Sequence, residues 1–407
     1  MIKAKMVQHP VGQGGLFCGE LRGGGRPLRW VYDCGSNQPD ELSREIMAVG
    51  EGGKIDLLFL SHLDSDHACG VDKLLLNGKV REVVLPYLSD AMLLATVARD
   101  DSTGRLTGSF IEAANDLARW FGSRGVDRIT FVGGGEGDEG SDGPIVPGDP
   151  GRGPEGDIEP KWSLEPVKVA QFSATFDQAE PMTDHPAAMQ QVALGAAVLP
   201  RTPNAFLNWV LIPYVHAPSA KLMKAFEQAL EEEFGSPLDK KAILRSAKDT
   251  QVRERLRVCY DALWGDHNLI SMTLYAGPRT TGVSALFISP FPRMRRQGVR
   301  PGGGGWMLTG DAHLDGKRRR QRFLSFYRDY TPLTSVLMMP HHGSVHNHSD
   351  LLLTDMPKLV VGYAAAGQNQ YGHPHRDVAE AVDAHEEAHF RQVSEERSTK
   401  LVIDVVL

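Results

Sequence analysis

The sequence predicts a single α/β domain on two observations. Short apolar runs rich in Val, Ile and Leu end in turns or polar clusters, and stretches with helical spacing separate them, as is typical of α/β proteins. The chain also has an ordinary composition: of its 407 residues 41% are hydrophobic, so it can bury a sizeable core. We therefore expect residues 1–407 to fold as one domain.

The first part of the chain alternates strands with helices. Strands are predicted at Trp30 to Tyr32, Ile55 to Leu60, Val80 to Leu85 and Arg128 to Val132, and helices at about Asp90 to Arg99 and Phe110 to Arg124. Each strand is apolar and is followed by a turn or a polar cluster. Such runs are buried and deliver side chains at their carboxyl ends.

Two segments interrupt this alternation. Residues 133–163 are rich in Gly, Pro and acidic residues and cannot bury enough apolar surface to offset the entropy of ordering, so we expect a flexible acidic loop. Residues 164–265 are predicted as a partly helical insertion, with a strand at Trp209 to Tyr214 and helices at Ala220 to Phe234 and about 237–264.

The remainder of the chain returns to strands. They are predicted at Ser271 to Ala276, Ser284 to Ser289, Trp306 to Thr309, Val336 to Met339, Leu359 to Tyr363 and Leu401 to Val406, with a helix at Arg376 to Glu387 before the last strand.

Charge and cysteine content exclude several classes of protein. The chain has 44 Lys and Arg against 51 Asp and Glu, a net charge of −7, which excludes a generally basic nucleic-acid coat but not a local basic patch. No apolar run approaches the roughly 18 residues of a membrane span, and no signal peptide is evident, so we predict a cytoplasmic protein without a membrane partner. The four cysteines form no CxxC pair, which argues against a disulfide framework or a thiolate zinc site.

One short stretch has the composition of a metal site. His62, Asp64, Asp66 and His67 follow an apolar strand within six residues, and two imidazoles with two carboxylates favour Zn, Mn or Fe. The alternative is a solvated polar turn. Three further strands are each followed by candidate ligands, which raises the odds of a shared site: Asp311, the pair His341 and His342, and His373.

These motifs resemble the metallo-β-lactamase superfamily, and within it the branch of the soluble domain of the DNA-uptake protein ComEC. The HxHxDH motif appears as His62-x-Asp64-x-Asp66-His67, and the glycine-rich VGQGD motif appears from Val11 to Gly15 without its final Asp. Asp33, Thr309 to Asp311, Pro340 to Ser344 and Tyr371 to Pro374 match the remaining motifs. The resemblance implies a four-layer αββα sandwich.

The resemblance also implies roles for these residues around two divalent ions, Zn or Mn. It assigns His62 and Asp64 to the first ion, with Asp311 bridging, and Asp66, His67 and His373 to the second. The third ligand of the first ion falls near His267 and Asn268, and either could fill it. His341 and His342 would act as proton donors to the substrate or orient a ligand, and Asp33 would orient a ligand; with Asp66 these are the candidate catalytic residues.

Basic residues lie on both sides of Asp311 in the sequence. Such a cluster favours a polyanionic substrate such as nucleic acid. It consists of Arg293, Arg295, Arg296, Arg300, Lys317, Arg318, Arg319, Arg320 and Arg322. The alternative is an ordinary solvated surface. The acidic residues at 133–163 could cover this cluster as a mimic of nucleic acid, or could be a solvated insertion without such a role.

The sequence therefore predicts a metal-dependent phosphodiesterase, foremost a deoxyribonuclease. Relatives of this branch occur in bacterial defence, so the resemblance is compatible with a regulated effector nuclease that has a regulatory protein partner. Two alternatives stay open: a hydrolase of a small phosphodiester or ester, and a nucleic-acid-binding module whose catalytic site has weakened.

Overall fold

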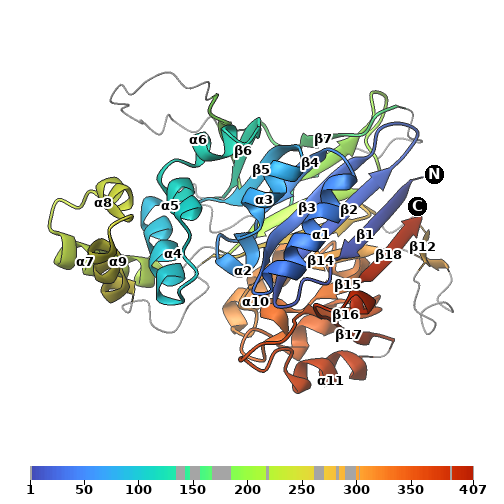
Figure 1. Ribbon diagram of the computed structural model, residues 1–407. Helices are drawn as coiled ribbons and strands as arrows, with labels where there is room; N and C mark the ends of the chain where they lie inside the picture. The colour runs from blue at the N-terminus through green and yellow to red at the C-terminus, as the bar shows by residue number, and fades with distance from the viewer. Residues whose placement is uncertain are drawn as a thin grey trace.

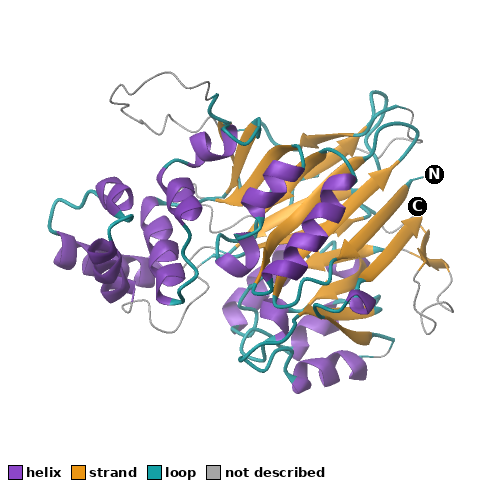
Figure 2. Ribbon diagram, in the orientation of Figure 1, coloured by secondary structure: helices purple, strands orange, loops and turns teal. Residues whose placement is uncertain are grey.

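The computed structural model describes residues 2–133, 143–146, 156–166, 185–216, 220–260, 270–280, 284–288, 299–301, 303–385 and 387–406. Within these ranges the chain forms two mixed β-sheets that pack face to face, with helices on both outer faces (Figure 1, Figure 2). The four-layer αββα sandwich expected from the sequence is therefore confirmed.

The larger sheet has ten strands in the described part of the chain. Their order is β13 (Val299–Pro301), β12 (Ser284–Ile288), β18 (Leu401–Val406), β1 (Lys3–Gln8), β2 (Gly14–Arg22), β3 (Leu28–Ser36), β4 (Ile55–Phe59), β5 (Val80–Pro86), β6 (Arg128–Val132) and β8 (Ala188–Val192). From β3 to β8 neighbouring strands are parallel, whereas the other half of the sheet is antiparallel.

The smaller sheet has eight strands among the described residues. Their order is β17 (His389–Val393), β16 (Val361–Ala365), β15 (Thr334–Met338), β14 (Gly305–Leu308), β11 (Met272–Gly277), β10 (Val210–Val215), β9 (Val198–Arg201) and β7 (Glu159–Trp162). The strands from β14 to β17 are parallel, and β11, β10, β9 and β7 continue the sheet in antiparallel fashion.

The helices fall into three groups. Those that follow strands of the larger sheet are α1 (Pro39–Glu51), α2 (Ser65–Ala68), α3 (Val71–Asn77), α4 (Asp90–Ser102), α5 (Gly108–Asn115) and α6 (Leu117–Gly122). The insertion contains α7 (Ala220–Phe234), α8 (Lys240–Ser246) and α9 (Thr250–Tyr260), which gather beside α4 and α5 (Figure 1). The smaller sheet carries α10 (Lys317–Phe326) and α11 (Arg376–Ala384). No helix in the described ranges combines the length and apolar character that a membrane span needs.

Alternating side chains along the strands build the layers of the core. In β14, Trp306 and Leu308 face the core between the two sheets, whereas Met307 packs on the outer side with Phe323 of α10. This period of two is the geometry of a strand covered on both faces, and it explains why these strands are apolar throughout. The sandwich is therefore held by a central core and an apolar layer beneath each set of helices.

Two of the predicted segments are shorter in the structure than the sequence suggested. Glu159–Trp162 forms β7 and pairs with β9, so the loop predicted at 133–163 ends earlier; residues 134–142 and 147–155 lie outside the described residues. The strands β8, β9 and β10 belong to the two sheets, so the insertion predicted at 164–265 is helical only from 220 to 260 in the part that is described.

The helix predicted at Phe110 to Arg124 is divided in two. Asp116 leaves helical geometry with φ of −154°, and its side chain accepts a hydrogen bond from the backbone N–H of Arg119. A carboxylate that caps a helix N-terminus competes with continuation of the preceding helix, so α5 ends and α6 begins at this residue.

Candidate metal centre

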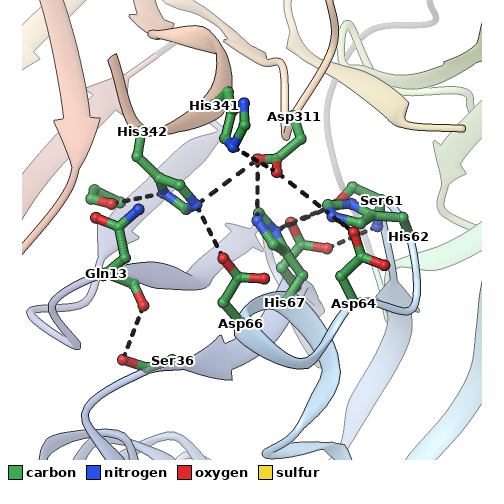
Figure 3. Close-up of polar contacts among 12 residues, drawn as sticks. Gln13, Ser36, Ser61, His62, Asp64, Asp66, His67, Asp311, His341 and His342 are labelled. Carbon is green, nitrogen blue, oxygen red and sulfur yellow. Dashed lines mark hydrogen bonds and ion pairs between the residues drawn. The ribbon is translucent and has the colours of Figure 1, made fainter. Parts of the chain in front are cut away.

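Segments that lie far apart in the sequence bring their side chains together at one edge of the sandwich. β3 supplies Asp33, the loop and short helix after β4 supply residues 61–67, and the turns after β14 and β15 supply Asp311 and residues 341–342. Carboxyl ends of parallel strands are where α/β folds place their sites. Figure 3 shows His62, His67, His342 and Asp311 pointing toward a common centre.

Two histidines after β4 are oriented through their Nδ1 atoms. The Nδ1 atom of His67 lies 2.8 Å from Asp33 Oδ2, and the Nδ1 atom of His62 lies 2.8 Å from Ser61 Oγ. Ser61 is fixed in turn, because its backbone N–H and its hydroxyl donate to the two carboxylate oxygens of Asp33 at 2.7 and 2.8 Å. Both imidazoles therefore direct Nε2 toward the centre.

The turn after β15 presents two more imidazoles on a strained backbone. His341 and His342 have φ of 47° and 56°, in the left-handed region that residues other than Gly seldom adopt. The Nδ1 atom of His342 lies 2.9 Å from the carbonyl oxygen of Ala365, and the Nδ1 atom of His341 lies 3.0 Å from Asn347 Oδ1. Backbone strain of this kind costs about 1–3 kcal/mol per residue and is concentrated at functional sites.

The Asp311 carboxylate lies between the four imidazoles. Its Oδ1 atom is 3.1 Å from His67 Nε2 and 3.7 Å from His342 Nε2. Its Oδ2 atom is 3.7 Å from His62 Nε2 and 3.5 Å from His341 Nε2. The carboxylate therefore divides the cluster into two halves, one at each oxygen.

Backbone contacts hold the Asp311 turn against its neighbours. The backbone N–H of Asp311 donates to Ser271 Oγ at 3.1 Å, and the backbone N–H of His341 donates to the carbonyl of Gly310 at 2.9 Å. Gly310 has φ of 51°, and a Cβ atom there would approach Ser271 Oγ to 2.8 Å. Only Gly fits this position, which explains the Thr-Gly-Asp sequence before the carboxylate.

Burial and charge favour a cation in the cluster. Burial lowers the pKa of His62 to about 4, so the ring is neutral and keeps a lone pair at neutral pH. Burial would raise the pKa of Asp66, but contact with His342 and the charge of His67 hold the pKa of Asp66 below its usual range. The surrounding imidazoles likewise hold the pKa of Asp311 well below its usual range against the effect of burial. Both carboxylates are therefore ionised.

The sequence matches a known superfamily over about the first third of the chain. Residues 16–156 match the family model described as the metallo-beta-lactamase superfamily. This part of the chain is therefore similar to the metallo-β-lactamase superfamily. The matched range contains Asp33 and residues 61–67, and the structure adds Asp311, His341 and His342 from outside the match. No curated protein matches the sequence.

The cluster has the donor set of a metal site. The ligand atoms of His62, His67 and Asp311 lie within 4.8 Å of one another, and so do those of Asp66, His67 and His342. The Nε2 atoms of the three histidines are buried and form no hydrogen bond within the described ranges. Convergent imidazole and carboxylate donors fit a divalent ion such as Zn²⁺ or Mn²⁺. Metal-dependent hydrolysis is the chemistry that this cluster and the superfamily similarity support.

His373 lies beside this cluster rather than within it. Its ring centroid is 5.4 Å from that of His341, and it belongs to neither group of potential ligands. The structure brings His342 to Asp66 and His67, and the assignment of His373 to the second ion stays a prediction from the resemblance. The other predicted third ligand, His267, and its neighbour Asn268 lie outside the described residues.

The position of the missing motif carboxylate is sterically restricted. A Cβ atom at Gly15 would lie 2.8 Å from the Cβ of Asp33 and 3.4 Å from the Nδ1 of His67. An Asp at residue 15 would therefore displace the carboxylate that orients His67. The departure from VGQGD is compatible with an intact cluster.

Arg99, Ser61 and Asn347 contact the cluster but were not predicted from the sequence. Arg99 lies in the last turn of α4 and forms an ion pair with Asp64. Ser61 and Asn347 hold the Nδ1 atoms of His62 and His341. No sequence motif identifies these three residues as part of the site, except that Ser61 directly precedes the HxHxDH motif.

The basic residues of α10 take up different environments. Lys317 and Arg318 are exposed, and Arg319 and Arg322 are half-buried. Arg320 is buried and donates to the carbonyl oxygens of two preceding residues at 3.2 and 2.5 Å, so it closes the turn rather than facing a ligand. Of the other predicted members, Arg293, Arg295 and Arg296 lie outside the described residues, as does the side chain of Arg300 in β13.

His216 lies at the same edge as the cluster. It follows β10, whose last residue Val215 pairs with Met272 at the start of β11, next to Ser271. The His216 ring stacks on Phe323 of α10 with a centroid separation of 6.4 Å. Burial, with the charges of Arg319, Arg322 and His313, lowers the pKa of His216 to about 3. His216 is therefore neutral in the folded protein at neutral pH.

The depressed pKa of His216 makes stability depend on pH. Below an unfolded pKa of about 6.5, the unfolded chain binds a proton that the folded chain does not, so this contribution is complete above that pH and is lost as the pH falls toward 3. Between about pH 7.5 and about pH 5, we expect the wild type to lose about 2 kcal/mol more unfolding free energy than His216→Phe. Urea unfolding at both pH values measures this difference, and parallel curves for the two proteins would contradict it.

Proposed function

We propose that this protein is a metal-dependent phosphodiesterase that hydrolyses nucleic acid, foremost DNA. The observation that carries the proposal is the position of cationic side chains beside the metal centre of a net acidic chain. Arg319 and Arg322 lie on α10 near His216, at the same edge of the sheet as the cluster. Phosphate groups bind such clusters through charge-assisted hydrogen bonds.

The residues of the centre have distinct tasks in this proposal. Asp66, His67 and His342 would hold a divalent ion at one oxygen of Asp311, and His62 and Asp64 lie at the other oxygen. A divalent ion bound there supplies Lewis acidity toward a phosphoryl oxygen and makes hydroxide available near neutral pH.

His341 is suited to proton transfer at the mouth of the centre. Its side chain is 27% exposed, whereas that of His342 is 4% exposed. Its Nδ1–H donates to Asn347 Oδ1, which leaves Nε2 as the atom that takes or gives a proton. With its Nε2 3.5 Å from Asp311 Oδ2, the ring is placed to receive a proton from entering water or to pass one to a leaving oxygen.

The resemblance to the soluble domain of ComEC supports DNA as the substrate. The motifs Pro340 to Ser344 and Tyr371 to Pro374 carry it and lie outside the range matched by the superfamily model. A role as a regulated nuclease in bacterial defence, with a regulatory protein partner in the cytoplasm, follows from the same resemblance and belongs to this proposal.

Incubation with DNA and divalent metal tests the proposed function. Purified protein with Mn²⁺ or Zn²⁺ should cleave linear or circular DNA, and the Asp66→Ala/His67→Ala variant should lose this cleavage. Turnover of small phosphodiesters or esters without DNA cleavage would overturn the proposal in favour of a small-substrate hydrolase. Retention of DNA without turnover would favour a binding module.

The two half-buried arginines of α10 should contribute more to DNA affinity than the two exposed basic residues. We expect Arg319→Gln/Arg322→Gln to weaken binding of single-stranded DNA and to reduce the slope of log K against log salt by about 1.4, from about 0.7 for each phosphate contact. Fluorescence anisotropy with a labelled oligonucleotide in EDTA measures binding without turnover.

The matched control is Lys317→Gln/Arg318→Gln, which removes the same charge from the exposed side of the same helix. We expect a smaller loss of affinity from this pair, because exposed side chains are screened by salt and solvent. An equal or larger effect of the control would show that α10 acts only as a diffuse basic surface.

A further inference from the structure

The two halves of the cluster differ in how firmly their donors are arranged. We define the inner position by Asp66, His67, His342 and Asp311 Oδ1, and the outer position by His62, Asp64 and Asp311 Oδ2. At the inner position, Asp33 and the carbonyl of Ala365 hold the Nδ1 atoms of His67 and His342. The inner donors are therefore preorganised for a cation.

At the outer position, Asp64 already has a cationic partner. Arg99 Nη1 forms an ion pair with Asp64 Oδ2, the same oxygen that lies 3.1 Å from His62 Nε2. The Asp64 side chain is 9% exposed and that of Arg99 is 22% exposed, so solvent screens the pair only weakly. The outer carboxylate is thus compensated by a charge that belongs to the protein.

The position of Arg99 is set by packing. Buried Leu94, Ala95 and Ala98 fix α4 against the core, and α9 packs along it. An open pocket of about 30 Å³ lies beside the pair and is lined in part by His62, Asp64 and Arg99. The packing of α4 therefore places the guanidinium beside Asp64.

His341 Nε2 also lies 3.5 Å from Asp311 Oδ2, and residues 270–280 add no further imidazole to the outer position. Ser271 uses its Oγ to accept the backbone N–H of Asp311. A guanidinium stays charged at all accessible pH values, so it repels a divalent ion that shares its carboxylate. Both features weaken the outer position relative to the inner one.

We propose that Arg99 replaces the outer metal ion, so that the centre holds one firmly bound divalent ion at the inner position. Arg99 then supplies positive charge next to His62 and Asp64, where a second ion was expected from the resemblance. The role follows from the contacts of Asp64 and concerns metal binding alone, so it does not depend on the identity of the substrate.

Metal titration tests this assignment without any substrate. Calorimetric titration of metal-free protein with Mn²⁺ or Zn²⁺, with elemental analysis after dialysis, should give about one tight equivalent per chain, and any second equivalent should bind at least about 10-fold more weakly. Arg99→Met, which removes the charge and keeps an unbranched side chain, should retain about two equivalents of metal per chain.

Two further variants distinguish an effect of the Arg99 charge on metal binding from an effect of the substitution on folding. Arg99→Lys keeps the charge and should retain about one equivalent, and Arg105→Met removes a half-buried cation six residues away and should behave as the wild type. Two equally tight equivalents in the wild type would overturn the proposal, as would one equivalent in an Arg99→Met protein whose thermal unfolding is unchanged. Absence of DNA cleavage would overturn the proposed function and leave this result intact.

Discussion

Replacement of Asp311 with Asn should remove bound divalent metal and reduce hydrolysis by about 10²–10³-fold or more. Asn has nearly the same shape but no charge, and both oxygens of Asp311 are engaged by imidazoles at 3.1 to 3.7 Å. The substitution leaves the buried cluster with one carboxylate fewer to compensate a cation. Metal content after dialysis and the rate of substrate hydrolysis measure the two effects.

The matched control is Asp315→Asn, which removes an exposed carboxylate four residues away. We expect it to keep both metal and activity. If Asp311→Asn retained metal with wild-type affinity, the cluster would not be the metal centre, even if hydrolysis were lost. Thermal unfolding of the metal-free proteins identifies any loss that arises from misfolding.

Local sequence patterns predicted most of the strands near the site. Residues 80–86 and 128–132 are apolar runs that end in a turn, and they became β5 and β6 with nearly the expected bounds. Fully buried strands carry this signal because both faces need apolar side chains. The strand β7, with the alternating exposed sequence Glu-Pro-Lys-Trp, carries no such signal and was predicted as loop.

The candidate ligands could be predicted because they follow strands, but their grouping could not. Nothing in the sequence predicts that His342 approaches Asp66, because this contact depends on the left-handed turn at residues 341 and 342. Arg99 was missed for a related reason. It lies on a helix face that is defined only once α4 is packed, and its contact with Asp64 spans 35 residues.

Asp33→Asn should weaken metal affinity by about 10–100-fold while leaving the fold intact. Asn tolerates the left-handed backbone of residue 33, whose φ is 58°, better than most residues do. The carboxylate of Asp33 accepts three hydrogen bonds, from the backbone and hydroxyl of Ser61 and from His67 Nδ1. An amide has one oxygen for these donors, so its N–H₂ group must face one of them.

The amide introduced by Asp33→Asn changes the tautomer of His67, because its N–H₂ group replaces a carboxylate oxygen. If the amide oxygen keeps the N–H of Ser61 at 2.7 Å, its N–H₂ group faces His67 Nδ1, which must then become an acceptor. The proton moves to Nε2, the atom that points at Asp311, and a protonated Nε2 cannot bind metal. A competition titration against a chelator measures the loss of affinity.

Asp56→Asn provides the control for this prediction, because Asp56 is a fully buried carboxylate on β4 of the same sheet. It pairs with Arg26 and accepts the backbone N–H of Arg29, away from the centre. Loss of this pair should lower the unfolding free energy without changing metal affinity. Wild-type affinity in Asp33→Asn, or an equal loss in Asp56→Asn, would mean that metal binding follows general stability rather than the orientation of His67.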